Sequence, residues 1–497
     1  MTITMQYPRS QAKLLRNTRS THTYFGIDGG AGANLLADLA GCDPSLRAVA
    51  SPRHADLLLI VEPVSQKLVP SILAIAKSLP TPARIILFKM PEVDLPTFAG
   101  TEIVPLERIF PEADRVSSLE QLLSAAWDTK ERSRLVIAEN AGKEQEPTTI
   151  QLPQKSEQEM ATELVVVSLG PIQPFTAGPL RLLLVCDGEQ VLSAQVEAGY
   201  AHRGIDEAMQ QATWLQGLKL ARLLDPLAPL AGQLAYVQAI ERLQGWQPSQ
   251  AMADYRNIVV ALERVQNTLW WCVRLAHHLT YEPLLTRSST LARTLSAFSA
   301  TLWQHSPQEW LLPQNEETVL AEKNSLPQNV LSKMEQLMTY VKHNRSLALR
   351  THNIGKIKAT QLHEAGISTG FVLEASEPGI QGSKGDIQSR LVTRAQSAQR
   401  DIQTIADMLT ASPIVSAPHE ANWTVLAGET YTTVRGPRGD IGLHLRSDGK
   451  DSSTQVLWQR PSAALLSLLP TLLEGQKLAD VELLVASLDL SMAEVDG

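Results

Sequence analysis

Apolar residues in the first third of the chain fall into short continuous runs, and the segments between the runs have helical spacing. The runs at 55–63 and 83–88 are almost wholly apolar, as strands buried on both faces of a parallel sheet are. Between them, residues 67–79 have the apolar spacing of an amphipathic helix. A third run at 102–106 and a capped apolar helix at 117–127 continue the alternation. Alternating strands and helices predict an α/β domain with a mostly parallel sheet.

The periodicity disappears between 143 and 160, where the chain is polar and contains two prolines. Such a composition is typical of a surface linker. The sequence therefore predicts a first domain at 1–142, a linker at 143–162 and a second domain at 163–497.

The second domain begins with a predicted hairpin and continues as long helices. Asp187-Gly188 stands between two apolar segments within 181–198, which is a signal for a tight hairpin turn. Helical patterns at 205–224, 227–244, 249–282, 286–305, 329–349 and 386–411 predict a helix-bundle core. The segment 306–328 is expected to be a loop. The tail is expected to contain strands at 422–428, 441–449 and 454–460 and a helix at 461–474.

Composition excludes several classes of protein. The net charge is −8 and no basic patch is interleaved with aromatics, so nucleic acid is not an expected partner. No apolar run is long enough to span a bilayer, and no secretory signal is evident at the start of the sequence. The three cysteines, Cys42, Cys186 and Cys272, are far apart and form no CxxC pair. This spacing argues against a disulfide framework and against an iron–sulfur cluster held by this chain alone.

Six ordered motifs run through the second domain. They are GPIQPFTAGPLRL (170–182), AGYAHRGIDEAM (198–209), YRNIVVALERVQNTLWW (255–271), GDIQSRLVTR (385–394), VRGPRGDIGLHLRSDG (434–449) and QRPSAALLSLLPTLLEGQKLADVELLVASLD (459–489). Together they resemble the large, quinone-site subunit of respiratory complex I and of the related membrane-bound group 4 nickel–iron hydrogenases. The resemblance implies an α+β, mainly helical-bundle fold of the hydrogenase large-subunit type, with β elements at both of its ends.

The first domain resembles the small subunit of complex I, which carries the terminal iron–sulfur cluster. The resemblance rests on FGIDGGAGANLL (25–36), on residues 51–88 and on EIVPLERIFPEAD (102–114). It implies a flavodoxin-like parallel sheet. The chain as a whole thus resembles a fusion of two subunits that are separate in complex I.

The resemblance also places the cofactor ligands of these families, and this chain lacks them. The four cluster cysteines of the small subunit fall at Gly29, Gly30, near Met90-Pro91 and near Ala113. The two CxxC motifs of hydrogenases fall at Asp225–Ala228 and at Ser491–Glu494. None of these positions supplies a thiolate. No cofactor is therefore expected on this chain, and iron–sulfur clusters are expected only on partner subunits.

The quinone site of the large subunit is altered in the same way. Its two histidines fall at Gln173 and Ala177, and its tyrosine falls at Pro226. Neither Ala177 nor Pro226 can donate a proton to a reduced quinone. Pro226 is also expected to put a turn where a helix would otherwise run. Quinone reduction at the usual place is therefore not expected.

What the chain retains is a set of charged residues. They are His202, Arg203, Asp206, Asp225, Arg256, Glu263, Asp386 and Arg390. In the related subunits several equivalents lie between the quinone cavity and the membrane arm. These side chains can form a buried network that moves or senses protons, or they can form ion pairs that fix the packing of helices. The sequence leaves both interpretations open.

A third interpretation concerns the glycines of GIDGGAGAN (26–34), which can be read as a loop that cradles a phosphate. The segment lacks the GxGxxG spacing, and no clear strand precedes it. Nucleotide binding is therefore the weakest of the functional hypotheses.

The leading hypothesis is a peripheral-arm subunit of a complex I-like or membrane-bound hydrogenase-like, ion-translocating complex. The subunit would be redox-inactive by itself, with a structural or proton-coupling role. It would lie on the cytoplasmic face of the membrane, with integral membrane subunits related to complex I and to antiporters as partners. The alternative is a subunit of an NADH- or ferredoxin-linked quinone oxidoreductase that uses clusters on partner chains.

Overall fold

The structure is a computed structural model. It describes residues 22–42, 46–79, 84–88, 104, 106–109, 114–116, 164–172, 176–302, 326–327, 329–365, 385–411 and 425–497. The predicted linker at 143–162, the predicted helix at 117–127 and most of the predicted loop at 306–328 lie outside these residues.

The chain divides into two compact units. The helical unit contains Ile205–Leu468 and Glu482–Asp489. The sheet unit contains the described residues up to Gly204, together with Leu469–Val481 and Leu490–Gly497. Each unit is built from segments that are distant in the sequence, so the C-terminal residues contribute to both.

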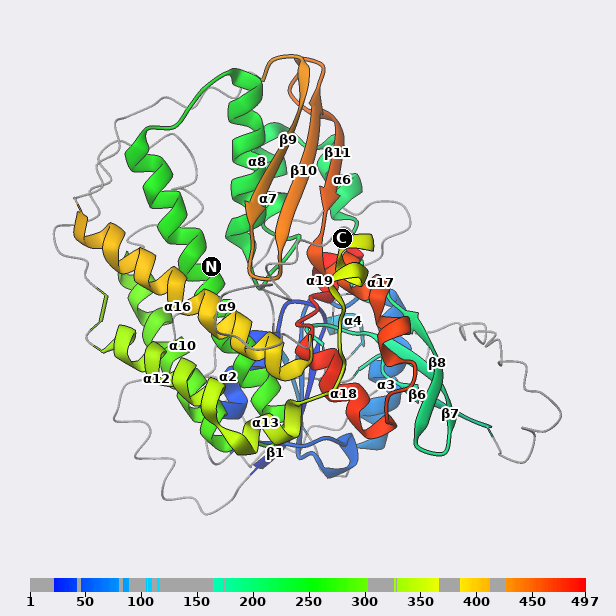
Figure 1. The fold of residues 1–497 in the computed structure, drawn as a ribbon. Coiled ribbons are helices and arrows are strands. Elements are labelled where there is room, and N and C mark those ends of the chain that lie inside the picture. The colour runs from blue at the N-terminus through cyan, green and yellow to red at the C-terminus, as the bar shows by residue number, and fades with distance from the viewer. Residues whose placement is uncertain are drawn as a thin grey trace. The chain divides into compact units, whose positions relative to one another are not determined.

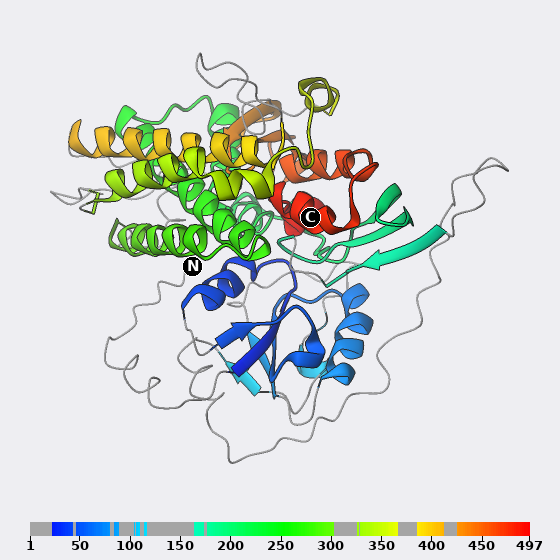
Figure 2. The same cartoon turned by 60° about the horizontal axis from the view of Figure 1, so that its bottom comes forward.

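A parallel sheet forms the first part of the sheet unit (Figures 1 and 2). Its strands are β1 (His22–Asp28), β2 (Leu46–Ala48), β3 (Leu57–Val61), β4 (Arg84–Phe88) and β5 (Asp114–Val116). They pair in the order β2-β1-β3-β4-β5, and every pairing is parallel. This order, with crossover connections, is the doubly wound arrangement, and it agrees with the mostly parallel sheet predicted from the sequence.

Central strand β3 shows why the predicted run is continuously apolar. All five of its residues are buried. Leu58 and Ile60 pack into one hydrophobic cluster, which includes residues of α3 (Val69–Ser78). Leu57, Leu59 and Val61 pack into the other cluster, which includes Leu39 of α2 (Ala33–Cys42). Both faces of the sheet are therefore covered, as in other parallel sheets.

An antiparallel sheet and a short helix complete the described core of the sheet unit. The sheet consists of β6 (Leu164–Leu169), β7 (Arg181–Asp187) and β8 (Gln190–Glu197). The predicted hairpin joins β7 to β8 through Gly188, whose φ of 58° suits glycine in a tight turn. The short helix is α19 (Met492–Asp496). Leu106–Ile109 forms α4 and Val104 is in no strand, so the strand predicted at 102–106 is wrong at both of its described residues.

The helical unit contains the long helices and a three-stranded antiparallel sheet. The helices are α6 (Ile205–Gln211), α7 (Trp214–Ala221), α8 (Pro229–Gln244), α9 (Gln250–His278), α10 (Glu282–Leu302), α12 (Val330–His343), α13 (Arg345–Thr351), α14 (Ala359–Glu364) and α16 (Ile387–Ala411). The strands are β9 (Gly428–Arg435), β10 (Asp440–Ser447) and β11 (Ser453–Gln459), in the order β11-β10-β9. Helices α17 (Pro461–Leu473) and α18 (Leu478–Ser487) have residues in both units.

Helix α9 is the central element of the helical unit. It packs against α8, α10 and α16, and α8 in turn packs against β9 and β10. Figure 1 shows α16 lying across α9, and α8 beside the β9–β11 sheet. The buried face of α9 therefore meets several elements at once, which places its few polar side chains in a protein interior.

Two predicted helices are each broken in the structure. The helix predicted at 205–224 is α6 and α7, because Thr213 caps α7 by accepting from the Gln216 amide. The helix predicted at 329–349 is α12 and α13, because the Asn344 side chain accepts from the Leu347 amide at 2.8 Å. Both caps satisfy backbone donors at a helix start, which makes a break favourable.

One strand of the tail lies later than predicted. The sequence predicted a strand at 422–428, whereas β9 begins at Gly428 and ends at Arg435. Val425 is buried but is not in a strand. The prediction followed the apolar residues at 422–428. The strand itself is rich in polar residues, because one face of its sheet is exposed to solvent.

Candidate functional site

The glycine-rich loop of the sheet unit follows β1 directly. No clear strand was expected before this loop, and the structure corrects that expectation, since β1 ends at Asp28. The Asp28 Oδ1 atom accepts from the amides of Gly30 at 2.8 Å and of Gly32 at 2.6 Å. These amides, just before α2, are the donors that a phosphate would need. A carboxylate of the chain already occupies them.

Gly29 and Gly30, which stand at the positions of cluster cysteines, are tightly packed. A Cβ atom at Gly29 would lie 1.9 Å from the Pro63 carbonyl oxygen. Gly30 has a φ of +125°, and a Cβ there would lie 3.2 Å from the Ala201 Cβ. Gly29 therefore has no space for a side chain, and Gly30 has a backbone conformation that cysteine rarely adopts.

Ala177, at the position of a quinone-site histidine, is 4% exposed and paired with the C-terminal segment. Its amide donates to the Leu490 carbonyl at 3.1 Å, and its carbonyl accepts from the Met492 amide at 2.8 Å. A Cβ at neighbouring Gly178 would lie 3.2 Å from the Gly30 Cα. The loop after β1, the segment around Ala177 and α19 are thus in direct contact. Gln173 lies outside the described residues.

His202 and Arg203 hold α19 within the sheet unit. The His202 Nδ1 donates to the Asp496 carbonyl oxygen at 2.6 Å, and the Arg203 Nη2 donates to the Ala493 carbonyl oxygen at 3.0 Å. The Asp496 carboxylate accepts from the amides of Gly199 and Ala201, each at 2.8 Å. Burial raises the pKa of Asp496 against these opposing hydrogen bonds. This arrangement fixes the C-terminal helix by charged and polar contacts.

The positions of the second hydrogenase CxxC motif are also buried at this helix. Ser491 precedes α19 and Glu494 lies within it, and they are 0% and 3% exposed.

Cys186 and Cys272 are buried in β7 and α9, and burial raises the pKa of both thiols, that of Cys272 to about 12. Among the described residues, no group of three or more His, Cys, Asp or Glu is arranged to hold a metal ion. The residues at the described ligand positions therefore do not fit an iron–sulfur or nickel–iron centre. Met90-Pro91 and Ala113, at the other two cluster positions, lie outside the described residues.

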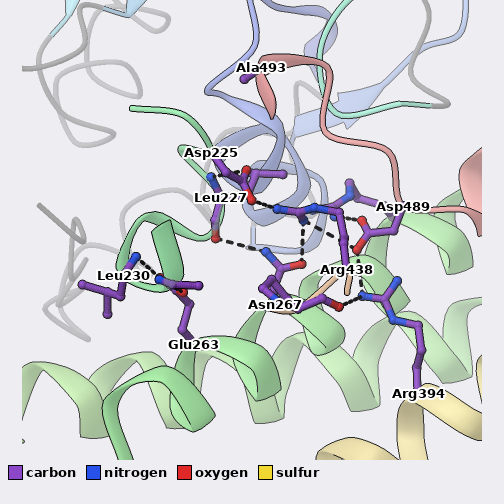
Figure 3. A network of polar contacts seen from close by, with 12 residues as sticks. Asp225, Leu227, Leu230, Glu263, Asn267, Arg394, Arg438, Asp489 and Ala493 are labelled. Carbon is purple, nitrogen blue, oxygen red and sulfur yellow. Dashed lines mark hydrogen bonds and ion pairs between the residues drawn. The ribbon is translucent and has the colours of Figure 1, made fainter. Parts of the chain in front are cut away.

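A buried ion-pair network lies in the helical unit (Figure 3). Arg438, in the turn between β9 and β10, pairs with Asp225 and lies 3.8 Å from the Asp489 Oδ2 atom. Asp489 also accepts from Arg394 at 2.7 Å and from Arg274 at 2.6 Å. Arg438, Asp225 and Asp489 are 1%, 3% and 5% exposed. These side chains bring three guanidinium groups and two carboxylates together.

The arginines control the charge of Asp489. Burial tends to raise the pKa of this carboxyl, but the fields of Arg394, Arg274 and Arg438 outweigh burial and lower the pKa. Asp489 has a φ of 54°, in the left-handed region that is unusual for a residue other than glycine. Arg394 also lies 4.0 Å above the ring of Trp271, which stabilises its charge further.

The network extends along α9 through Asn267 to Glu263 (Figure 3). The Asn267 Oδ1 atom accepts from Arg438 at 3.2 Å, and its Nδ2 donates to the Leu227 carbonyl at 3.0 Å. Glu263 accepts from the amides of Leu230 at 2.8 Å and Ala231 at 3.1 Å. Burial raises the pKa of Glu263 to about 8, although both amides oppose the shift.

The segment between α7 and α8 connects these contacts. Pro226 lies in a turn there, as the sequence predicted, and Ala228 is the N-cap residue of α8. The Asp225 Oδ1 atom accepts from the Leu227 amide at 3.2 Å. Arg438, which pairs with Asp225, and Glu263 therefore bind the two ends of one short segment, 225–231.

The other predicted site residues of the helical unit form separate contacts. Arg256 makes two hydrogen bonds to Glu241, of 2.6 and 3.0 Å, and so joins α9 to α8. Asp206 of α6 pairs with Arg460, which follows β11. These two pairs fix the packing of neighbouring elements.

Asp386 and Arg390 act at the start of α16. Asp386 accepts from the amides of Asn353 and Ser389, each at 2.9 Å, and its Oδ2 lies 3.0 Å from the His352 Nδ1. Arg390 donates to the carbonyls of Gly355 and Gly385 and, at 2.6 Å, to the Ser487 hydroxyl. Burial lowers the pKa of Arg390 to about 10, with Asp386 opposing the shift.

Several residues of the network were not among the sequence-based candidates. They are Asn267, Arg274, Arg394, Arg438 and Asp489. Arg394, Arg438 and Asp489 nevertheless stand within the motifs at 385–394, 434–449 and 459–489. The motifs were a signal for these residues, but the sequence alone does not tell which charges meet.

Comparison with known proteins gives a family match in the C-terminal part. Residues 380–497 match the family described as "Respiratory-chain NADH dehydrogenase, 49 Kd subunit". An NADH-quinone oxidoreductase subunit of Thermodesulfovibrio yellowstonii is 24% identical over 405 residues, which cover 67% of this chain and 96% of that protein. An F(420)H(2) dehydrogenase subunit of Methanosarcina mazei is 26% identical over 374 residues, which cover 68% of this chain and 100% of that protein.

A solved structure has a similar fold. It is a chain of the membrane-bound sulfane sulfur reductase (MBS), an archaeal respiratory membrane complex, with a TM-score of 0.56 and 20% identity. The similarity covers 68% of this chain and 99% of that chain. The relationship of the first third to the small subunit stays a prediction. The predicted resemblance to the large subunit is confirmed: residues 380–497 match the 49 kDa subunit family, and about two thirds of the chain is similar to the two dehydrogenase subunits over nearly their full length.

Proposed function

We propose that this chain is a peripheral-arm subunit of a complex I-like, ion-translocating membrane complex, redox-inactive by itself. Its role is to hold subunits together and to couple them through buried charges. The similarity to subunits of NADH-quinone oxidoreductase and F(420)H(2) dehydrogenase, and to a chain of a respiratory membrane complex, supports the assignment to this type of assembly.

The observation that carries the redox-inactive role is the packing around the predicted ligand positions. Gly29 has no space for a Cβ, and Gly30 lies against Ala201. The amide and the carbonyl of Ala177 both form hydrogen bonds with the C-terminal segment. A cluster or a quinone head group needs both ligating atoms and space. At Gly29 the chain supplies neither, and Gly30 and Ala177 supply no ligating side chain, so the proposal includes no electron-transfer step through this chain.

The partners follow from the same proposal. Integral membrane subunits related to complex I and antiporters would bind this chain at the cytoplasmic face of the membrane. None of the helices that the structure describes is both long and apolar enough to cross a bilayer. Membrane attachment in the proposal therefore depends on partner subunits.

Metal analysis of the purified full-length chain tests the proposal. We expect iron and acid-labile sulfide far below one equivalent per chain after anaerobic purification. An affinity tag on this chain should at the same time recover antiporter-like membrane subunits from solubilised membranes. Stoichiometric iron and sulfide on the isolated chain would overturn the redox-inactive role.

A second function is favoured by the names of the relatives. Several are NADH-quinone oxidoreductase subunits, so this chain can also be part of a quinone oxidoreductase that uses clusters on partner chains. His202 and Arg203, which hold α19, are the residues to test. Quinone reduction by the purified complex, lost in His202→Ala and Arg203→Ala but kept in the surface variant Glu335→Gln, would favour this function over the first.

A further inference from the structure

Glu263 differs from other buried carboxylates of the helical unit. Asp225, Asp489 and Glu241 each pair with a guanidinium group. Glu263 is 7% exposed and accepts from two backbone amides. Among the residues that the structure describes, no cationic side chain lies within ion-pair distance of Glu263. A buried carboxylate without a counter-ion is the group for which the gain of a proton is most favourable.

The two amides belong to the first turn of α8. Helix starts leave backbone N–H groups without partners inside the helix, and α8 has no capping side chain of its own, since Ala228 is its N-cap residue and Pro229 has no N–H. Leu230 and Ala231 supply the next two donors, and both point to Glu263. Glu263, a residue of α9, therefore caps the start of α8 in place of a residue of α8 itself.

The segment 225–231 is consequently held at three points. Arg438 binds its first residue, Asp225, and Asn267 binds the Leu227 carbonyl. Glu263 binds its last two residues. Of these three binding side chains, Glu263 is the carboxylate, so its contact is the one that the gain of a proton changes.

We propose that Glu263 is a reversible proton-binding site, and that its protonation loosens the first turn of α8 and the turn at 225–228. The carboxylate takes one proton from water and becomes a neutral acid, and the reverse step returns the proton. The acid keeps one strong acceptor oxygen, so it can no longer accept equally from both amides. The coupling role of this site rests on the proposed function, whereas the protonation itself does not.

The surrounding charges leave Glu263 free to respond to pH. Arg264, the neighbouring cation on α9, favours the ionised form, but it is itself paired with Asp401 of α16 at 2.8 Å. The nearby Asp225 and Arg438 pair with each other. From α10, the groups that reach the next turn of α9 are the neutral Leu295 carbonyl and Ser299 hydroxyl, both bound to Gln266. Burial is the main influence on the Glu263 pKa, which it raises to about 8.

Infrared spectroscopy of the full-length chain tests the proposal. Ordinary carboxyls have pKa values of about 4 and are ionised at about pH 6, so a C=O stretch of a neutral acid at that pH reports a buried protonated group. We expect such a band in the wild type, and we expect it to disappear as the pH is raised through the pKa of Glu263. Burial also raises the pKa of Asp496, so the Glu263 band is the part of this signal that is lost in Glu263→Gln, shifted in Glu263→Asp and unchanged in Glu335→Gln, where the same chemical change is made on an exposed helix face.

Hydrogen exchange of the Leu230 and Ala231 amides tests the coupling to α8. After correction for intrinsic exchange, protection of these amides should rise with pH in step with loss of the acid band, and this step should be absent in Glu263→Gln. Acid C=O bands that are the same in the wild type and in Glu263→Gln at about pH 6 would overturn the proton site. Protection that does not change with pH would overturn the link to α8. Iron on the isolated chain would overturn the proposed function alone, because neither readout here depends on a cofactor.

Discussion

At the scale of single residues, the helical unit is held by buried charged side chains that pair with one another. Asp489 lies at the centre, since it accepts from Arg274 and Arg394 and is close to Arg438. Burying two ions is costly unless their partners and hydrogen bonds are in place. The left-handed φ of 54° at Asp489 adds strain that the surrounding ion pairs must offset.

We expect Asp489→Asn to destabilise the helical unit by roughly 3–5 kcal/mol, the usual cost of removing one partner of a buried ion pair. The asparagine keeps the shape of the side chain but leaves three arginines around a neutral group. The midpoint of urea unfolding, followed by circular dichroism, measures the effect. Asp448→Asn, which removes a carboxylate bound to the exposed Lys450, is the matched control and should leave the midpoint unchanged. Equal midpoints for the two variants would contradict a stabilising role for the network.

At the scale of elements, helix caps decide where the long helical patterns stop. Thr213 accepts from the Gln216 amide, and the Gln216 side chain accepts from the Thr213 amide at 3.0 Å. This capping box starts α7 and separates it from α6. The helical pattern predicted at 205–224 runs through Thr213 without a break, so the cap is the local signal for the break.

Replacing Thr213 by alanine should destabilise the protein by about 1 kcal/mol, the usual contribution of a hydroxyl N-cap. Thr213→Ser keeps the hydroxyl acceptor and should remain close to the wild type. Urea unfolding of the three proteins measures the difference. If the alanine and serine variants lose the same stability, the cap is not the cause of the break.

The sequence predicts elements well where the pattern has one physical explanation. Buried β3, the hairpin at Gly188 and the long helices α9 and α16 were all predicted, because their patterns depend on local burial and turn geometry. Strand β1 was missed because HTYFGID is not a continuous apolar run. The candidate residues included Asp225 and Glu263 but not Arg438 and Asp489. Tertiary packing determines which charged residues pair, and a local sequence pattern contains no information about tertiary packing.

At the scale of the whole molecule, the stability of the protein should depend on pH through Glu263. The folded protein keeps a proton on this group up to a pKa of about 8, whereas the unfolded chain loses it at the ordinary value of 4.5. Between these values the folded state binds one more proton than the unfolded state, so the Glu263 contribution to the free energy of unfolding falls as the pH rises. Above the folded pKa the contribution is constant. The lowered pKa values of Asp489 and Asp386 act only at lower pH, where stability is lost as these carboxylates gain protons.

Glu263→Gln removes the titrating group and keeps one acceptor for the amides of α8. The variant should therefore gain stability relative to the wild type as the pH is raised from about 5 to about 8, and the difference should stop growing above that range. Thermal midpoints measured across this range for the wild type, Glu263→Gln and Glu335→Gln give the three curves needed. The exposed Glu335 should show no such trend, because water solvates its charge in both the folded and the unfolded state. A constant difference between wild type and Glu263→Gln would mean that Glu263 is ionised throughout, with the two amides and Arg264 stabilising its charge more than burial opposes it.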